Sequence, residues 1–290
     1  YTSNNKYFVN SFAKFKTLQG KQVSYNNITD SNAAWEIVQN FSLPSCAIIK
    51  HANPSGVSTA KDLISAYDKA FKCDPVSAFG GIYAFNKQVN GIVANKLAET
   101  FVEVIIAPDF SSEALNIFKN KPNVRLLKVD SDPKKDMVDF KKVNGRILLQ
   151  TIDYVEDEFK NLKVVTKKHP DNALLEDLKF AWYICKYVKS NAIVFVKDQS
   201  TVAIGAGQMS RLDSVRIAEK KAIENSMDLQ GSVVASDAFF PFRDTVDEIL
   251  KLGVSGIIHP GGSIKDEESI IAANDKNIVM LNTGIRHFRH

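Results

Sequence analysis

Residues 81–107 read GIYAFNKQVNGIVANKLAETFVEVIIA and contain the pattern that decides the fold class. Two short apolar runs, Gly81–Phe85 and Val102–Ala107, flank residues 89–100, where apolar residues recur at the 3.6-residue spacing of a helix. Strand, helix and strand in this order are typical of α/β proteins. Because the two runs are apolar throughout rather than alternating, we expect a sheet that is covered on both faces.

The same rhythm continues on both sides of this stretch. Further strands are predicted at residues 47–49, 124–129, 192–196, 202–204, 233–234, 256–258 and 278–280. Further helices are predicted at residues 30–41, 61–71, 111–118, 171–188, 210–226, 244–252 and 266–274. Between Val129 and Pro170 the pattern weakens into charged residues and two or three candidate edge strands. We therefore expect two α/β units, residues 1–168 with the connector and residues 169–290.

Composition excludes several classes of protein. The chain has 290 residues, 44% of them apolar, a net charge of +4 and a mean hydropathy of −0.14. This balance argues against a nucleic-acid coat or an acidic disordered tail, and a small positive surplus suits a pocket for small anions. Neither a membrane span nor a signal peptide is predicted, so we expect a cytoplasmic protein. Three widely separated cysteines, Cys46, Cys73 and Cys185, predict reduced thiols and no zinc site.

The first polar segment that follows an apolar run is residues 49–56 (IKHANPSG), where a predicted strand leads through an adjacent Lys-His pair into a predicted turn at residues 53–56. A positive charge beside a histidine favours the neutral imidazole, which can accept a proton. His51 is therefore a candidate general base, and Lys50 is a candidate fixed charge for an oxyanion. The alternative is a solvated Lys-His pair at the end of a strand.

Five other segments could bind a ligand. Residues 74–81 (DPVSAFGG) contain a glycine pair, and residues 205–211 (GAGQMSR) lead a glycine turn into a helix with Arg211 in its first turn, a geometry that holds phosphates or carboxylates. Residues 236–244 (SDAFFPFRD) could stack on a flat ring. Residues 260–263 (PGGS) and the cationic end at 286–290 (RHFRH) complete the set. Ordinary turns, an aromatic core and a frayed tail are the alternatives.

Taken together, KHANPSG, DPVSAFGG, FVEVIIAP, KSNAIV, IGAGQMSR, SDAFFPFRD, HPGGSIKD and RHFRH resemble, in this order, the transformylase domain of the AICAR formyltransferase/IMP cyclohydrolase family. The resemblance runs from about Gly20 to the last residue. It implies two cytidine-deaminase-like three-layer α/β/α units without zinc. It also implies transfer of a formyl group from 10-formyltetrahydrofolate to the 5-amino group of AICAR, which gives FAICAR in de novo purine biosynthesis.

The resemblance also implies a set of functional residues. It assigns catalysis to Lys50, His51 and Asn191, with His51 as proton acceptor, Lys50 stabilising the transition state and Asn191 orienting the carboxamide and amine. It places the nucleotide at Gly80, Glu103, Arg211, Phe239 and His290. It places the folate at Leu212, Pro241, Phe242, Asp244, Ser263, Ile264 and Arg286. It makes Asp237 a candidate ligand of a potassium ion.

Two departures from the family pattern concern the N-terminal side. Nothing before Gly20 matches the family's Arg-Tyr-Gly-x-Asn-Pro-His-Gln motif, and these 290 residues contain nothing that resembles the family's cyclohydrolase domain, so we expect formyl transfer alone from this chain. The resemblance further implies a homodimer whose sites draw residues from both protomers, with no nucleic-acid or membrane partner. The competing hypotheses are a non-catalytic module that binds a nucleotide or folate, a zinc-dependent nucleotide deaminase and, less favoured by the charge balance, an RNA-binding protein.

Overall fold

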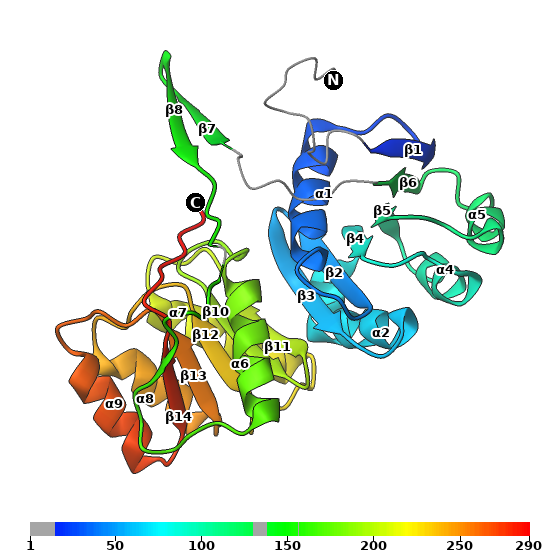
Figure 1. Cartoon of the computed structure of the whole chain (residues 1–290). Coiled ribbons are helices and arrows are strands. Elements are labelled where there is room, and N and C mark those ends of the chain that lie inside the picture. Colours follow the sequence, from blue (N-terminus) through cyan, green and yellow to red (C-terminus); the bar gives the residue numbers. More distant parts are fainter. Residues whose placement is uncertain (1–14, 130–137, 156) are drawn as a thin grey trace.

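The computed structural model describes residues 15–129, 138–155 and 157–290 (Figure 1). The predicted α/β class is confirmed. Residues 1–14 of the predicted first unit lie outside the described residues, as do residues 130–137, the charged run at the start of the connector, and residue 156.

The described elements alternate along the chain. The first part holds β1 (Lys16–Gln19), α1 (Tyr25–Val38), β2 (Ser45–Lys50), β3 (Asn53–Thr59), α2 (Leu63–Cys73), α3 (Pro75–Ala78), β4 (Gly81–Phe85), α4 (Gly91–Ala98), β5 (Val102–Ala107), α5 (Ser112–Phe118) and β6 (Arg125–Lys128). The middle holds β7 (Val138–Val143), β8 (Arg146–Thr151) and β9 (Lys163–Val164). The last part holds α6 (Asn172–Cys185), β10 (Ile193–Lys197), β11 (Ser200–Gly205), α7 (Arg211–Glu224), β12 (Val233–Ser236), α8 (Arg243–Lys251), β13 (Gly256–His259), α9 (Asp266–Asp275) and β14 (Val279–Asn282).

One continuous sheet joins the two parts. Twelve of the described strands pair in the order β1-β6-β5-β4-β2-β3-β11-β10-β12-β13-β14-β9, while β7 and β8 pair only with each other. On either side of the central β3–β11 pair the topology is the same. An antiparallel hairpin (β2–β3 or β10–β11) is followed by one antiparallel and two parallel neighbours.

The order of helices and strands is duplicated as well. The series α1-β2-β3-α2-β4-α4-β5-α5-β6 corresponds element by element to α6-β10-β11-α7-β12-α8-β13-α9-β14, and α3 is an insertion in the first series. We call these series the first half and the second half. The chain is therefore an internal duplication of topology that the amino-acid sequence does not display as a repeat.

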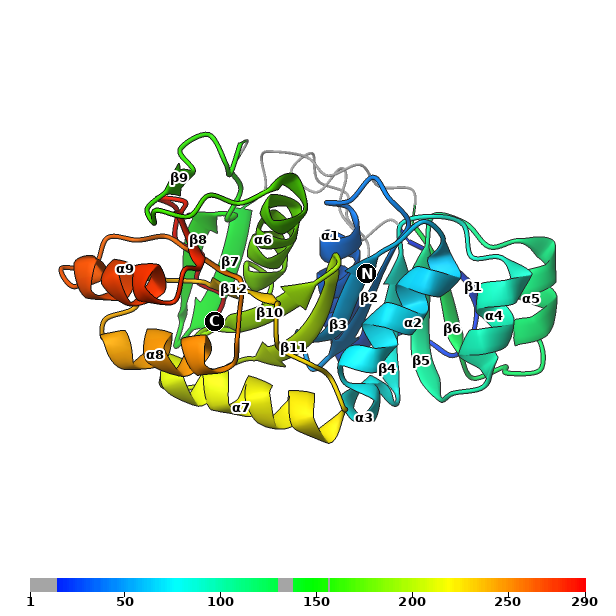
Figure 2. The same cartoon turned by 90° about the horizontal axis from the view of Figure 1, so that it is seen from below.

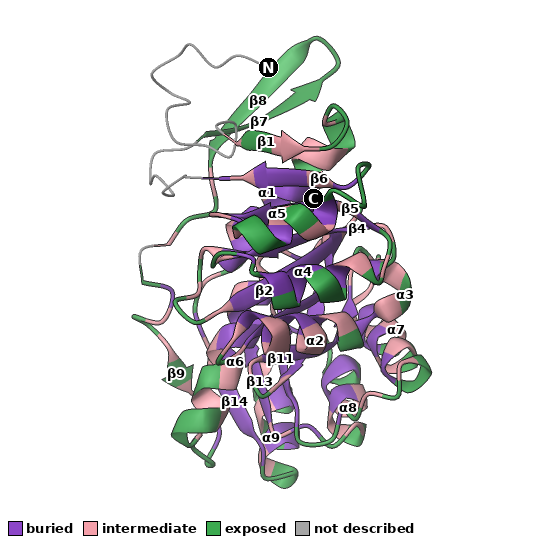
Figure 3. Cartoon of the chain, turned by 90° about the vertical axis from the view of Figure 1, so that its right-hand side faces the viewer, coloured by how far each residue is buried: buried purple, intermediate pink, exposed green. Residues whose placement is uncertain are grey.

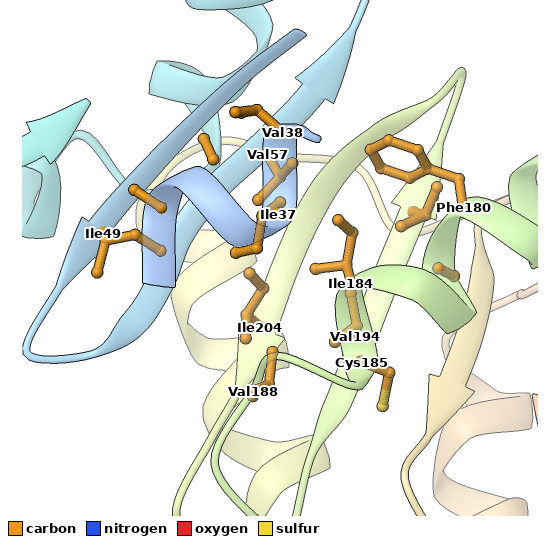
Figure 4. Close-up of a cluster of buried hydrophobic side chains, with 14 of the residues drawn as sticks. Ile37, Val38, Ile49, Val57, Phe180, Ile184, Cys185, Val188, Val194 and Ile204 are labelled. Atoms are coloured by element: carbon orange, nitrogen blue, oxygen red, sulfur yellow. The ribbon is translucent and has the colours of Figure 1, made fainter. Parts of the chain in front are cut away.

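Helices cover both faces of the sheet (Figure 2). On one face, α1 and α6 lie side by side over the junction of the halves, and Ile37 and Val38 of α1 share a buried cluster with Ile184 of α6 (Figure 4). On the opposite face, α2, α4 and α5 pack on the first half, and α7, α8 and α9 pack on the second half. The shared cluster under α1 and α6 makes the two halves one hydrophobic body.

Polar caps explain where most of the helices begin. Asp171 accepts a hydrogen bond from Leu174 N and caps α6, as its position after Pro170 suggests, and Ser210 caps α7 through Asp213 N. Helix α1 begins at Tyr25, before the predicted residue 30, because Ser24 and Asn27 form a reciprocal capping box.

Residues 53–56 (NPSG) were expected to form a turn, and this expectation is wrong, because residues 53–59 form β3 at the centre of the sheet. Pro54 lies at a register shift between β2 and β3, the kind of position where a strand tolerates a residue without an N–H. Gly56 is required by packing, since a Cβ there would lie 1.9 Å from the carbonyl oxygen of Ala70 in α2. The polar residues, proline and glycine of this segment therefore made a buried strand resemble a turn in the sequence.

Hydrogen bonds from a buried threonine hold the β3–β11 junction. Thr201 Oγ1 accepts from Val57 N (2.9 Å) and donates to Val57 O (3.2 Å), and Thr59 N donates to Gln199 O (2.9 Å). The side chain of Thr201 thus satisfies backbone groups that a regular ladder would pair, and these groups would be costly to bury unpaired.

Among the described residues, no helix combines the length and the apolar character that crossing a membrane requires. The cytoplasmic location stays a prediction.

Candidate functional site

The predicted site residues gather along one edge of the sheet. At this edge lie the turn between β2 and β3, the end of β11, the start of β10, and the ends of β12, β13 and β14. The carboxyl ends of parallel strands are where α/β proteins bind ligands, and here they belong to the second half.

The β2–β3 turn presents Lys50 and His51. His51 and Ala52 have positive φ angles of 51° and 60°, and Asp30 of α1 accepts a hydrogen bond from Ala52 N (2.8 Å). Consecutive residues with positive φ form the tight turn that suits a two-residue hairpin. This turn leaves the imidazole of His51 exposed at the sheet edge, where it can meet a ligand.

Lys50 points along the first half, away from the junction. Its Nζ donates to Phe79 O (2.8 Å) and Gly80 O (3.0 Å), which uses two of its three N–H groups. Gly80 has a φ of 63°, and its N–H donates to Phe101 O (2.8 Å). The predicted residue Gly80 therefore lies beside Lys50, and the DPVSAFGG segment brings a fixed ammonium group to the edge.

Glu103 lies on β5, close to the same edge. Its Oε2 forms an ion pair with Arg125 Nη1 at 2.7 Å, and the Arg125 side chain is largely buried. The carboxylate is thus fixed by a neighbouring strand of the first half. We call Lys50, His51, Gly80 and Glu103 the lysine–histidine group.

Asn191 lies at the start of the second half, just before β10. Its N and its Nδ2 both donate to Gln208 O, at 3.2 and 2.9 Å, and its carbonyl oxygen accepts from Ser214 Oγ at 2.8 Å. The peptide bond between Ser190 and Asn191 is cis. Asn191 therefore ties the segment before β10 to the glycine turn after β11.

Arg211 and Asp237 form the centre of the second-half site. Arg211 Nη2 contacts Asp237 Oδ1 at 2.8 Å, and Arg211 Nε donates to Ser236 Oγ at 3.1 Å. Asp237 is 1% exposed, and its second oxygen accepts from Ser190 Oγ. The guanidinium group is consequently fixed in direction at the N-terminus of α7, where backbone N–H groups also favour an anion.

Aromatic rings and the C-terminal segment, residues 283–290, flank this centre. The guanidinium carbon of Arg286 lies 5.3 Å from the ring centroids of both Phe239 and Phe288. The predicted residue His290 is exposed and lies with its ring centroid 5.8 Å from that of Phe288. The C-terminal segment therefore lies beside the aromatic strip of residues 236–244 rather than free in solvent.

The remaining predicted folate residues are half-buried (Leu212 and Ser263) or exposed, and we call them the rim. Phe242 is 58% exposed, with Lys265 Nζ 5.3 Å above its ring, and the Ile264 side chain is fully exposed. The other members are Leu212 in the first turn of α7, Pro241 before α8, Asp244 in the first turn of α8 and Ser263 before α9. We call Asn191, Arg211, Asp237, Phe239, Arg286 and this rim the arginine–aspartate group.

The two groups are well separated within one chain. From β2 to β12 the sheet takes four strand steps, which amounts to roughly 19 Å at the usual spacing between strands. Glu103 on β5 is two steps farther away, and Lys50 points in its direction. The predicted residues therefore lie on a common edge, but one chain does not bring them to one point.

A sequence model of the family described as the AICARFT/IMPCHase bienzyme matches residues 1–221, which is most of the 290-residue chain. The chain belongs to this family. AICARFT/IMPCHase proteins are enzymes of purine biosynthesis that combine AICAR transformylase and IMP cyclohydrolase activities. The match includes Lys50, His51, Asn191 and Arg211, while the aromatic strip and the C-terminal segment lie beyond it.

His259 of this AICARFT/IMPCHase chain is a buried histidine that the sequence pattern did not identify as a site residue. His259 ends β13, accepts a hydrogen bond from Gly261 N at Nδ1 (3.2 Å), and lies with its ring centroid 5.1 Å from that of Phe240. Burial, with a smaller contribution from the Arg211 charge, lowers the pKa of His259 to about 4. The imidazole is therefore neutral at pH 7 and adds no charge beside Arg211. In the sequence, its position at the end of an apolar run and directly before the Pro260-Gly261 turn is the pattern that could have identified it.

The described residues contain no group of three or more His, Cys, Asp or Glu side chains arranged to hold a metal ion. Asp237, the candidate potassium ligand of this AICARFT/IMPCHase chain, already pairs with Arg211 and accepts from Ser190. Its charge is therefore neutralised within the chain, and potassium binding stays a prediction.

Replacing Asp237 by asparagine removes one member of a buried ion pair and leaves the Arg211 charge uncompensated. We expect the free energy of unfolding to fall by about 3–5 kcal/mol, the usual cost of breaking such a pair from one side. Urea unfolding followed by circular dichroism measures the change. Asp213→Asn is the control, because Asp213 pairs with Arg216 on the surface, where we expect a loss below about 1 kcal/mol. Equal losses in the two variants would contradict the assigned role of Asp237.

Proposed function

We propose that this chain transfers a formyl group from 10-formyltetrahydrofolate to the 5-amino group of AICAR and releases FAICAR and tetrahydrofolate. The observation that carries the proposal is a sheet edge, in a member of the AICARFT/IMPCHase family, that presents an exposed Lys-His turn and a directed guanidinium group. The duplicated topology is what two cytidine-deaminase-like units would produce, and it supports that finer fold assignment.

The reaction needs help at the substrate amine. Its lone pair is delocalised into the ring and carboxamide, so it attacks the formyl carbon only as its proton is removed. A carbon–nitrogen bond forms to the amine, the bond from the formyl carbon to N10 of the folate breaks, and the proton passes to N10. We assign proton acceptance to His51, which the tight turn leaves accessible. Lys50, held by two carbonyl oxygens, stabilises the charge that develops on the formyl oxygen.

The second half supplies the binding contacts in this proposal. Arg211, fixed by Asp237 and Ser236, binds the phosphate or ribose of the nucleotide at the N-terminus of α7. Asn191 orients the carboxamide, and Phe239 with Arg286 offers a stacking surface for the flat ring. The rim, with Phe242, Ser263 and Ile264, receives the folate.

Replacing His51 by alanine tests the assigned general base. We expect kcat for formyl transfer to fall by about 100-fold, the lower end of the effect of a positioned base. Formation of tetrahydrofolate, followed by absorbance, measures the rate, and AICAR binding measured by calorimetry should persist. His169→Ala is the control, because His169 is also exposed but precedes α6, the opposite end of that helix from Asn191.

Three results would change the assignment. Formyl transfer by His51→Ala at the wild-type rate would remove His51 from the mechanism. Nucleotide binding without turnover in the wild-type chain would favour a non-catalytic binding module. Formation of IMP from AICAR by the chain alone would show that it also has the family's cyclohydrolase activity.

We further assign the complete site to a homodimer. Because the lysine–histidine group and the arginine–aspartate group lie several strands apart in one chain, a second copy can complete each group with the other. Closed two-fold dimers are the commonest homo-oligomers, and their symmetry would create two equivalent sites. His51 of one protomer would then act on a nucleotide held by Arg211 of its partner.

Mixing two inactive variants tests this shared site. His51→Ala and Arg211→Ala proteins should each be inactive as homodimers, while a hybrid dimer contains one intact site. After random exchange, half of the dimers are hybrids with one working site of two, so about one quarter of the wild-type activity should return. A mixture of each variant with itself is the control. No recovery, with exchange shown by mass-tagged protomers, would place each site within one chain.

A protruding hairpin offers a surface for the partner. Strands β7 and β8 stand away from the body beside the C-terminus, and all twelve residues are exposed (Figure 1 and Figure 3). Val138, Phe140, Ile147 and Leu149 share one face of the hairpin, since Phe140 lies opposite Leu149 and Lys142 opposite Ile147. A two-stranded hairpin is marginally stable alone in water, and a second copy that covers this apolar face would stabilise it.

Replacing Leu149 by aspartate tests the hairpin surface. We expect the wild-type chain at micromolar concentration to sediment with twice its chain mass of 32.2 kDa, and Leu149→Asp to shift toward one chain mass. Leu148→Asp is the matched control, because Leu148 has a similar exposure but lies on the opposite face, across from Lys141. A monomeric wild-type chain, or equal dissociation by both variants, would refute the assignment.

A further inference from the structure

The C-terminal segment crosses the site edge strand by strand. Thr283 N donates to His259 O and Gly284 N to Pro260 O at the end of β13. His287 N donates to Asp237 O after β12, and Arg289 O accepts from Ser190 N before β10. The segment therefore passes directly over the arginine–aspartate group, and its backbone contacts include Asp237 itself.

His287 is the buried member of this segment. The residue is 1% exposed, while its neighbours Arg286 and Phe288 are exposed. Its ring enters the space between α6 and the segment that joins β8 to β9, with its centroid 4.8 Å from that of Trp182. The buried side chain of His287 thus lies between Arg286, which is exposed, and Arg289, which is half-buried.

Carboxylates meet both nitrogens of this ring. Nδ1 lies 2.7 Å from Asp153 Oδ2, and Nε2 lies 3.4 Å from Glu158 Oε2. Only Nδ1 is hydrogen-bonded, since Nε2 and Glu158 Oε2 are buried against each other without a hydrogen bond. A neutral ring that donates at Nδ1 would turn the lone pair of Nε2 toward a carboxylate oxygen, whereas the imidazolium carries a proton there. Lys186 Nζ contacts Glu158 Oε1 at 2.8 Å, so two acidic groups are balanced by Lys186 and a protonated His287.

We propose that His287, as an imidazolium held between Asp153 and Glu158, is a positioning residue that fixes the C-terminal segment across the site edge. Arg286 is thereby held over Phe239, and Arg289 reaches Glu36 of α1 in the first half. The effect of His287 on catalysis rests on the proposed function, because it acts through Arg286, which we assign to folate binding. The effect of His287 on the order of the C-terminal segment is independent of the proposed function.

Titration of His287 supports this role. Burial opposes the charged form, but the hydrogen bond to Asp153 and the charge of Glu158 outweigh it and raise the pKa of His287 above its usual 6.5. Because the folded pKa is raised, the stabilisation is complete below the unfolded value and is lost as pH rises through the folded value. The other charged or titratable groups near the cluster include Lys186 and Tyr183 of α6, Tyr187 just after α6, Asp157 before Glu158, and Arg289 of the segment.

Trp182 gives a direct readout, because a protonated imidazole quenches the fluorescence of an indole that it touches. In a Trp35→Phe background, where Trp182 is the sole tryptophan, emission should rise with pH about a midpoint above 6.5. Asp153→Asn, at a partly exposed partner, should lower this midpoint by at least about one pH unit. A midpoint at or below 6.5, or one that Asp153→Asn leaves unchanged, overturns the imidazolium assignment.

Positioning is measured by trypsin cleavage after Arg286, which releases residues 287–290 and is read by mass spectrometry. His287→Asn should accelerate this cleavage by about tenfold or more, with cleavage at the remaining sites unchanged. His169→Asn is the control. If all sites accelerate together, His287 contributes only to global stability and the positioning role is refuted.

The same variant connects the segment to catalysis. His287→Asn should raise KM for 10-formyltetrahydrofolate by about tenfold and change kcat little, because Arg286 binds and does not react. Accelerated cleavage with an unchanged KM would refute the effect on catalysis. An inactive wild-type chain that still shows the titration and the protection would refute the proposed function and leave the positioning of the segment intact.

Discussion

The antiparallel junction of β3 and β11 is the constraint on which the rest of the structure depends. Thr201 bonds both backbone groups of Val57, and α1 and α6 cover this junction with one shared apolar cluster. Because the two strands run in opposite directions, the β2–β3 turn lies at the same edge as the end of β11. The exposed Lys-His turn of the first half is thereby placed in line with the strand ends of the second half.

Charge at this edge is organised by pairing. Asp237 neutralises and aims Arg211, Glu103 pairs with Arg125, and Asp153 with Glu158 balances Lys186 and His287. Buried ion pairs of this kind add little net stability, but they fix the direction of a side chain. His259, kept neutral by burial, adds nothing to the field beside Arg211. The edge therefore presents a few directed positive groups rather than a diffuse basic surface, in keeping with the modest net charge of +4.

The sequence predicts the strands that are apolar throughout but misses β3, whose residues are mostly polar or small. Gly81–Phe85 and Val102–Ala107 have the predicted bounds, since buried parallel strands leave a continuous apolar run. Residues 53–56 were predicted as a turn because Pro and Gly usually mark turns. Here the close approach of α2 requires Gly56 and the irregular register tolerates Pro54, and both constraints are tertiary. Motif resemblance named Arg211 and Asp237, but it could not show the separation of the two groups, which follows from strand order. The roles of His287 and His259 depend on burial, to which single residues in a pattern give no clue.

Duplication explains why a functional edge exists on one side of the sheet. Both hairpin turns have two consecutive residues with positive φ, and an aspartate of the preceding helix holds each of them, Asp30 for Ala52 and Asp177 for Gln199. The equivalent positions after β4 and β12 have diverged. Asn86, the equivalent of Asp237, donates to the carbonyl oxygens of Phe41 and Leu43 and closes the α1–β2 loop with a neutral amide. Helix α2 begins with Leu63, whereas its equivalent α7 begins with Arg211. Replacing an amide and a leucine by a carboxylate and a guanidinium group at equivalent positions gives the second half a directed cation at its strand ends. The same backbone therefore presents a directed guanidinium group at one edge and a closed, neutral loop at the other.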